Sequence, residues 1–558
     1  NAQREHWVDG DPTLAKMMNS LNDEELREIK RGGQDPKKIY AAYEKALLSK
    51  EKPTVILIKT VKGDGMGEMA QGRNTAHQKK NLTPDERIMM AKAYGIPLPE
   101  KAMRNAEFYL PEEDSEEIKY LRTHRQKLGG FLPSRIVNCP SLKPPKLSVF
   151  KSLLEGSKGR ENSTTMGVVQ LLRSLMKDED IGHLIVPIVP DEARTFGMDG
   201  LFNIAGIYSP EEQKYTPVDA ESILSYREAV DGQILQEGIC ETGAIASFQA
   251  AGTAYAMHGI PTIPFYIFYS MFGFQRVGDM IWSCADMMCR GFLLGGTAGR
   301  TTLNGEGIQH EDGHSQILAS TIPNLKSYDP AFSFELAIIV KEGIRRMYED
   351  QENIFYYLTV YNENYVMPAM PDNVKKEDIL KGAYCFSPST NISERPSLKL
   401  LASGSIMIQA INAAAMLDTL GYAVSIWSVT SYNELAREAL SCDRYNRLNP
   451  EKNPKIPYVQ QCFNSAKEPV IAITDYMKAL PASIAKWMPN NFTVLGTDGF
   501  GLSESREHLR DHFEISTNHI VHAALASLYA LDNTNSELLL KQMSKLNINH
   551  NKIDPSTR

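Results

Sequence analysis

Short apolar runs that alternate with helix-like stretches constrain the fold of this chain more than any other feature of its sequence. The expected strands are residues 184–189, 260–266, 292–294, 398–401, 424–429, 470–474 and 492–495, and the expected helices are residues 163–176, 271–288 and 407–420, with another that begins near Glu241. Runs that are apolar throughout are typical of strands buried on both faces of a parallel sheet. Because strands and helices alternate, we predict an α/β protein with mainly parallel sheets.

The first part of the chain has a less regular pattern. Asp35 precedes Pro36, which is the arrangement of an N-cap followed by a proline in the first turn, and it predicts a helix. The apolar run at 54–58 predicts a strand of a parallel sheet. Residues 63–85 are rich in glycine and polar residues and predict a loop.

Two proline-rich stretches predict where the chain divides. Residues 138–146 and 366–397 hold several prolines, as linkers do. A chain of 558 residues is long enough for three or four domains. We therefore expect three α/β units.

Charge and cysteine content limit the partners and the compartment. The net charge is −8, which argues against nucleic acid and against an anionic membrane surface as partners. The most apolar stretch, residues 260–274, contains prolines and falls short of a membrane span, and the polar N-terminus lacks the pattern of a signal peptide. Seven cysteines without a CxxC pair are typical of reduced thiols. The composition thus predicts a soluble cytoplasmic protein.

One motif matches a metal-binding pattern. His310-Glu-Asp-Gly-His314 fits H-E-x-x-H, in which two histidines on one helix face bind zinc in peptidases. Two glycines precede the match and Asp312-Gly313 lies inside it, which disfavours a regular helix. A polar loop that carries histidines is the preferred interpretation, and no residue is assigned as a metal ligand.

Three further sites each admit two interpretations. Gly63-Asp-Gly65 and residues 497–501 suit either phosphate binding or tight turns. Asp191 and Glu192 follow the strand expected at 184–189, and ligands bind at the carboxyl ends of such strands. The acidic pair equally suits the cap of a following helix.

Glu241 has unusual neighbours for a carboxylate. On a helix, Ala244, Ile245 and Phe248 share its face. A carboxylate on an apolar face is costly unless it has a partner. A glutamate in the first turn is also favoured by the helix dipole, and the pattern leaves both interpretations open.

Four stretches together closely resemble one family. They are residues 191–198 (DEARTFGM), 233–241 (QILQEGICE), 266–276 (YIFYSMFGFQR) and 299–314 (GRTTLNGEGIQHEDGH). They resemble the homodimeric first, decarboxylating component of the bacterial pyruvate dehydrogenase complex, a thiamine diphosphate enzyme of the transketolase superfamily. The likeness extends over essentially the whole chain, from residues 32–38 (GGQDPKK) to 496–501 (GTDGFG) and beyond.

The resemblance implies a transketolase-like fold of three units. Residues 1–140 would be the remainder of a diphosphate-binding domain, residues 141–370 a pyrimidine-binding domain and residues 371–558 a C-terminal domain. A homodimer is also implied, because the cofactor of this superfamily lies between domains of two subunits. The family's GDG…Asn motif for magnesium and diphosphate is expected before Asn1, which would leave the first domain incomplete. Gly63-Asp-Gly65 lies where the family has a different turn.

The resemblance implies five catalytic side chains. Glu241 matches the carboxylate that hydrogen-bonds N1′ of the aminopyrimidine. His310 and His77 match histidines near the substrate, which are plausible hydrogen-bond donors and acid–base groups. Glu192 and Glu306 match positions that line the site.

The same resemblance implies side chains that bind the cofactor. Tyr269 and Phe272 match the aromatic wall on which the pyrimidine stacks. Arg276 matches a position that lines the site, and Lys62 matches a lysine near the diphosphate end.

The implied reaction is oxidative decarboxylation of pyruvate with thiamine diphosphate and Mg²⁺, followed by reductive acetylation of the lipoyl domain of dihydrolipoyl acetyltransferase. Residues 71–83 and 211–227 are polar, and we expect them to be mobile lids over the site. The alternatives are another 2-oxo acid dehydrogenase or a transketolase-type enzyme, a non-catalytic piece that serves in assembly, and a zinc peptidase.

Overall fold

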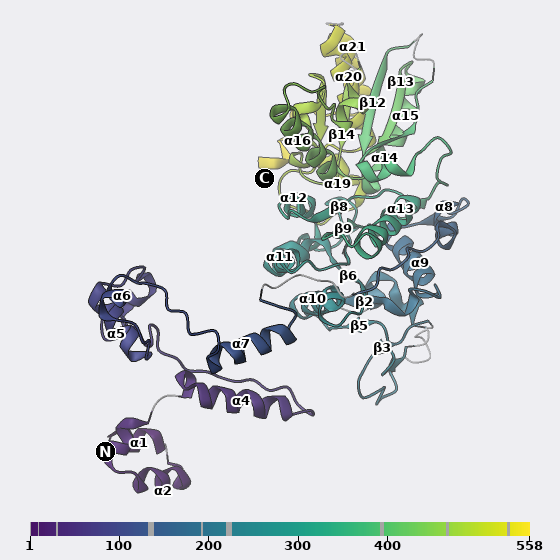
Figure 1. Ribbon diagram of the computed structural model, residues 1–558. Helices are drawn as coiled ribbons and strands as arrows, with labels where there is room; N and C mark the ends of the chain where they lie inside the picture. The colour runs from purple at the N-terminus through teal and green to yellow at the C-terminus, as the bar shows by residue number, and fades with distance from the viewer. Residues whose placement is uncertain are drawn as a thin grey trace. The chain divides into compact units, whose positions relative to one another are not determined.

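The computed structural model describes residues 2–8, 10–29, 32–131, 139–190, 193–202, 204–218, 226–390, 395–464, 468–532 and 536–557 (Figure 1). The chain forms two compact units, Asn1–Ser134 and Arg135–Arg558. Among the described residues, no helix is both long enough and apolar enough to cross a membrane.

Within its described residues, the first unit is helical. Its helices are α1 Ala2–Val8, α2 Pro12–Ser20, α3 Asp23–Glu28, α4 Pro36–Leu48, α5 Pro84–Ala93, α6 Glu100–Arg104 and α7 Glu116–Lys127. The predicted cap is confirmed, because the Asp35 carboxylate accepts hydrogen bonds from the backbone N–H groups of Lys37 and Lys38 at the start of α4. A short 3₁₀ turn, η2 Asn74–Gln78, carries His77 within the predicted loop.

The strand predicted at 54–58 is wrong. The described part of the first unit contains no strand, and Val55 and Leu57 are 81% and 92% exposed. A strand requires a neighbouring strand to satisfy its backbone N–H and C=O groups. Apolar patterning alone does not supply that neighbour.

The second unit contains a six-stranded sheet whose paired strands run parallel. The strand order is β5-β2-β6-β7-β9-β8. The strands are β2 Ile185–Val189, β5 Leu235–Gln236, β6 Ile263–Tyr269, β7 Phe292–Gly296, β8 Leu325–Tyr328 and β9 Phe355–Thr359. The predicted α/β class with mainly parallel strands is confirmed here. The expected strand at 260–266 is displaced, so that β6 ends at Tyr269.

Helices cover both faces of this sheet. Figure 1 shows α10 Glu241–Met257 and α11 Ser270–Asp286 on one face, and α9 Thr164–Met176 and α13 Ser333–Ile344 on the other. Packing between α11 and β6 is close, because a Cβ added at Gly273 would lie 2.1 Å from Cε2 of Phe268. This close approach holds the start of α11 against the end of β6.

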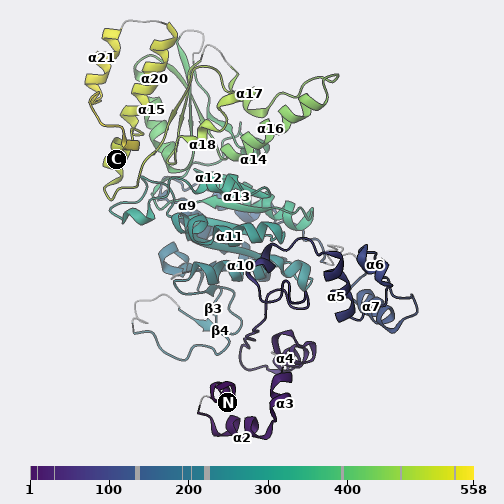
Figure 2. The ribbon, with the colours of Figure 1, turned by 90° about the vertical axis from the view of Figure 1, so that its left-hand side faces the viewer.

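A second sheet of the same unit has the strand order β11-β13-β12-β14-β15. Its strands are β11 Tyr384–Ser387, β12 Ser397–Ala402, β13 Ala423–Ser428, β14 Val470–Ile473 and β15 Phe492–Leu495, with β11 antiparallel to β13 and the other pairs parallel. Figure 2 shows α15 Met407–Thr419 and α20 Thr517–Asp532 on one side of it and α16 Tyr432–Leu448 on the other. Within the stretch 366–397, residues 376–381 form α14 Lys376–Lys381.

Shorter elements complete the description of this unit. They are β1 Glu161–Asn162, β3 Ile207–Tyr208, β4 Glu228–Ala229, β10 Tyr365–Val366, α8 Lys151–Leu154, α12 Ser315–Ser320, α17 Tyr458–Phe463, α18 Ala479–Ala482, α19 Arg506–His512 and α21 Ser536–Lys545. Buried apolar side chains form one large cluster that runs through both sheets.

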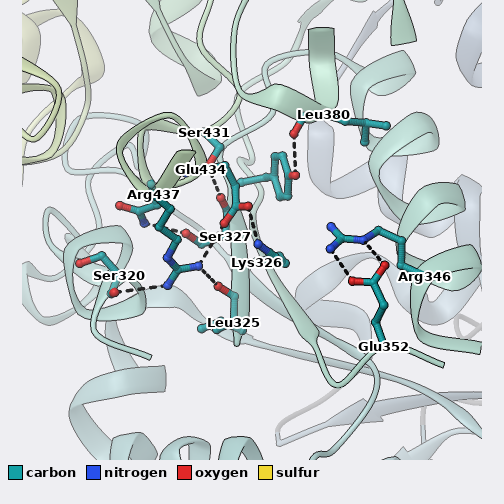
Figure 3. A network of polar contacts seen from close by, with 12 residues as sticks. Ser320, Leu325, Lys326, Ser327, Arg346, Glu352, Leu380, Ser431, Glu434 and Arg437 are labelled. Carbon is teal, nitrogen blue, oxygen red and sulfur yellow. Dashed lines mark hydrogen bonds and ion pairs between the residues drawn. The ribbon is translucent and has the colours of Figure 1, made fainter. Parts of the chain in front are cut away.

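A network of polar contacts, called the polar seam below, joins the two sheets (Figure 3). Nζ of Lys326 on β8 lies 2.6 Å from Oε2 of Glu434 on α16. The hydroxyl of Ser431 donates to the carbonyl of Ser327 at 2.6 Å. Arg437 on α16 donates to backbone carbonyls at and ahead of the start of β8. Side chains of α16 and of its N-cap residue thus satisfy main-chain carbonyls of β8 and of the turn before it.

Asp329, which follows β8, belongs to the same seam. Its buried carboxylate accepts hydrogen bonds from the hydroxyls of Thr359 and Ser403 at 2.6 Å each, and from the Tyr361 hydroxyl. Burial raises the pKa of Asp329 to about 6. Because Ser403 follows β12, this carboxylate links the two sheets.

Candidate active site

The candidate site lies at the carboxyl ends of β6 and β7. Tyr269 is the last residue of β6, and α11 begins directly after it. Residues 299–314 follow β7 and carry Glu306 and His310. The carboxyl edge of a parallel sheet is where α/β proteins bind ligands.

Glu241 is the first residue of α10, and its side chain is 13% exposed. Its predicted apolar face is confirmed, because Ala244, Ile245 and Phe248 are fully buried. The partner that such a carboxylate requires is Arg276 on α11, whose Nη1 donates to Oε1 of Glu241 at 2.9 Å. The ion pair orients the carboxylate at the helix start.

Three rings gather beside this ion pair. The ring of His310 stacks on Tyr269 with centroids 4.8 Å apart and an interplanar angle of 11°. Phe272 meets both rings edge-on, at 5.6 Å from Tyr269 and 5.4 Å from His310. The guanidinium of Arg276 lies over the Phe272 ring, 3.8 Å from its centroid. The rings therefore connect the Glu241 end of the site to His310.

Glu306 pairs with the site histidine. Oε2 of Glu306 lies 3.3 Å from Nδ1 of His310. A carboxylate only accepts hydrogen bonds, so this contact favours a proton on Nδ1 and leaves Nε2 of His310 as an acceptor. The structure thus brings together six of the residues that the sequence analysis selected, which are Glu241, Tyr269, Phe272, Arg276, Glu306 and His310.

Three selected residues are not part of this group. Lys62 and His77 belong to the first unit, where Nζ of Lys62 contacts Nδ1 of His77. An ammonium only donates, so His77 accepts at Nδ1 and carries its proton on Nε2. Glu192 lies outside the described residues.

The local structure disfavours the zinc-peptidase alternative. His310 ends a short 3₁₀ turn, η7 Ile308–His310, so the two histidines do not share a helix. Asp312 accepts hydrogen bonds from the backbone N–H groups of His314 and Ser315, directly before and at the start of α12. Among the described residues, no group of three or more His, Cys, Asp or Glu side chains is arranged to hold a metal ion.

Sequence reasoning missed a buried ionisable group beside the site. Glu311 is buried, and neither of its carboxylate oxygens has a hydrogen-bond partner among the described residues. Burial, reinforced by the charge of Asp475, raises the pKa of Glu311 to about 8, although nearby Arg300 acts against the rise. The only sequence signal was the position of Glu311 inside the H-E-x-x-H match.

Two family models match the second unit. Residues 142–368 match the middle domain of the pyruvate dehydrogenase E1 component. Residues 382–516 match the transketolase-like C-terminal domain.

Curated relatives align along nearly the whole chain. A pyruvate dehydrogenase E1 component of Pseudomonas aeruginosa is 48% identical over 99% of this chain and 62% of the relative. That of Escherichia coli (strain K12) is 47% identical over 99% of this chain and 62% of the relative. The chain spans about three fifths of the length of these relatives.

Solved structures share the fold. A transketolase from Pichia stipitis superposes with a TM-score of 0.60 at 15% identity, over 90% of this chain and 66% of that one. A transketolase from Campylobacter jejuni gives a TM-score of 0.57 at 17% identity, over 88% and 66%. At such identities the likeness shows the fold alone, and that fold is transketolase-like.

Proposed function

We propose that the chain belongs to the family of pyruvate dehydrogenase E1 components and acts in the thiamine diphosphate-dependent oxidative decarboxylation of pyruvate. One observation carries the proposal, namely the Glu241–Arg276 ion pair beside the stacked rings of Tyr269 and His310. A carboxylate next to aromatic rings at the edge of a parallel sheet suits an aminopyrimidine, which offers both ring nitrogens and a flat face.

The side chains present fit the pyrimidine end of the cofactor. Glu241 is mostly buried yet reachable, at 13% exposure, and Tyr269 and Phe272 are half-buried. Glu241 would hold the ring nitrogen N1′, and the two aromatic side chains would take the face of the pyrimidine. When bound, thiamine diphosphate supplies the nucleophilic carbon and the electron sink that decarboxylation of a 2-oxo acid requires.

The chain's own residues then have separate tasks. Arg276 orients the Glu241 carboxylate. His310 and His77 present opposite ring tautomers, because one contacts a carboxylate and the other an ammonium. His310 therefore offers Nε2 as an acceptor, whereas His77 offers an N–H donor, and both can act on groups of the substrate.

Several roles complete the proposal. Glu306 holds the His310 ring, Lys62 holds the His77 ring and lies near the diphosphate end, and Glu192 lines the site. Residues 1–140, 141–370 and 371–558 correspond to the remainder of the diphosphate-binding domain, the pyrimidine-binding domain and the C-terminal domain. The protein is a cytoplasmic homodimer that uses Mg²⁺ and passes the acetyl group to the lipoyl domain of dihydrolipoyl acetyltransferase.

Calorimetric titration of the full-length protein with thiamine diphosphate and Mg²⁺, joined to a profile of 2-oxo acid substrates, tests the proposal. We expect saturable cofactor binding and turnover of pyruvate in preference to other 2-oxo acids. Turnover of sugar phosphates would place the protein with transketolases. Absence of cofactor binding would indicate a role in assembly alone.

A further inference from the structure

Residues 299–314 are tied near both ends to loops of the five-stranded sheet. Asp475, which follows β14, accepts hydrogen bonds from the backbone N–H of Thr301 at 3.1 Å and from its hydroxyl at 2.8 Å. At the other end, the backbone N–H of Met477 donates to the carbonyl of Gly313 at 2.8 Å. The segment that carries the site histidine is therefore held by the second sheet.

Arg300 strengthens this attachment. Its buried guanidinium donates to the carbonyls of Thr497 and Gly499, the latter at 2.5 Å. A Cβ added at Gly313 would lie 2.3 Å from Cζ of Arg300, so the guanidinium is pressed against the backbone that follows His310. One side chain thus connects the 497–501 loop to the turn that presents the histidine.

Gly501 provides a second, direct contact. A Cβ added at Gly501 would lie 2.3 Å from Cβ of Glu311 and 2.9 Å from its Cγ. Any larger residue would force the loop and the turn apart. Because Glu311 immediately follows His310, such a shift is transmitted to the His310 ring and to its stack on Tyr269.

We infer that the 497–501 loop, through Gly501 and Arg300, positions the His310 ring for its task in the site. Both are positioning residues, because they act through the backbone around His310 and do not touch the reacting groups. The inference rests on the proposed function for the task of His310. It also gives a reason for the contact between the TDGFG sequence of this loop and residues 299–314. A misplacement of about 1 Å in such a group costs about a hundredfold in rate.

The substitution Gly501→Ala in the full-length protein tests this inference, with Gly200→Ala as the matched control. The control adds the same methyl group where no described atom lies within 4 Å. Two quantities are measured, the kinetics with pyruvate and the rate at which diethyl pyrocarbonate modifies His310 in the cofactor-free protein. Exposed His258 in the same chain serves as the reference for modification.

In Gly501→Ala we expect kcat to fall by about ten- to a hundredfold with little change in KM, and the modification rate of His310 relative to His258 to change about threefold or more. Gly200→Ala should match the wild type in both measurements. A folded Gly501→Ala protein with unchanged kcat and unchanged His310 reactivity would overturn the inference.

Arg300→Lys serves where Gly501→Ala does not fold. Lysine keeps the charge but lacks Nη1, the guanidinium nitrogen that donates to both carbonyls, so His310 reactivity should change in the same direction. An unchanged reactivity in this variant would also count against the inference. If the wild-type protein failed to turn over pyruvate, the proposed function would fail, and the modification rates would still decide whether the loop positions His310.

Discussion

At the scale of the residue, Glu241 combines a structural task with a proposed chemical one. It begins α10, packs above fully buried side chains and keeps one oxygen on Arg276. We expect Glu241→Ala to lower the decarboxylation rate by a few hundredfold, equivalent to about 3–4 kcal/mol, because a contact that strengthens in the transition state is lost. Pyruvate turnover with an artificial electron acceptor measures the effect, and circular dichroism checks the fold. A wild-type rate would remove Glu241 from the proposed site.

Glu311 makes stability depend on pH. Its pKa is about 8 in the folded protein, above the ordinary value of 4.5, so the protonated form stabilises the fold. That contribution is complete below pH 4.5 and is lost as the pH rises through 8, by up to about 1.4 kcal/mol per pH unit. We expect Glu311→Gln, which cannot ionise, to lose less stability than the wild type between pH 5 and pH 9.

Thermal unfolding at both pH values measures this difference. Arg300, Asp475 and Glu306 face the same group. They are present in both proteins, so comparison of the variant with the wild type isolates Glu311. Parallel pH profiles of the two proteins would contradict the prediction.

At the scale of the element, Gly273 and Gly278 of α11 allow the effect of packing on stability to be measured separately from the effect of helix propensity. A Cβ at Gly273 would lie 2.1 Å from the Phe268 ring, whereas none of the described atoms lies within 4 Å of a Cβ at Gly278. We expect Gly273→Ala to destabilise the protein by about 1–3 kcal/mol because α11 must move away from β6. Gly278→Ala should stabilise it by about 0.5–1 kcal/mol through helix propensity alone. Denaturant unfolding of both variants measures the two effects, and equal effects would show that α11 does not pack as described.

At the scale of the whole molecule, substitution of His77 tests whether this histidine acts in the decarboxylation of pyruvate or in the later transfer to a lipoyl domain. If His77 acts after decarboxylation, His77→Ala should keep much of the pyruvate decarboxylation measured with an artificial acceptor and lose most of the transfer to a lipoyl domain. The physical reason is that Lys62 contacts Nδ1 of His77 and leaves the Nε2–H as a donor, which suits a hydrogen bond to a leaving thiolate. Equal losses in both assays would place His77 in the decarboxylation step.

Closure of residues 71–83 and 211–227 over the site also concerns the whole molecule, and it stays a prediction. The first contains the 3₁₀ turn that carries His77, and residues 219–225 of the second lie outside the described residues. Limited proteolysis with and without the cofactor and pyruvate tests both segments. Cleavage there should slow when ligand is bound, and cleavage unaffected by ligand would contradict closure.

The sequence alone determined the elements whose signals are local. The expected strand at 492–495 coincides with β15, the helix at 407–420 ends one residue beyond α15, and Asp35 caps α4 as predicted. Periodicity, capping and turn chemistry depend on residues a few positions apart, so they can be read along the chain. The motifs likewise select Glu241, Tyr269 and His310 as candidate site residues.

Only the tertiary structure decided which distant segments meet. It paired Glu241 with Arg276 across 35 residues, placed β9 between β7 and β8, and set the 497–501 loop against the turn after His310. It also showed that the apolar run at 54–58 has no strand beside it in the described part of the first unit. Such pairings depend on burial and backbone hydrogen bonds summed over the whole chain. A local pattern indicates the polarity of a segment but not which other segment lies beside it.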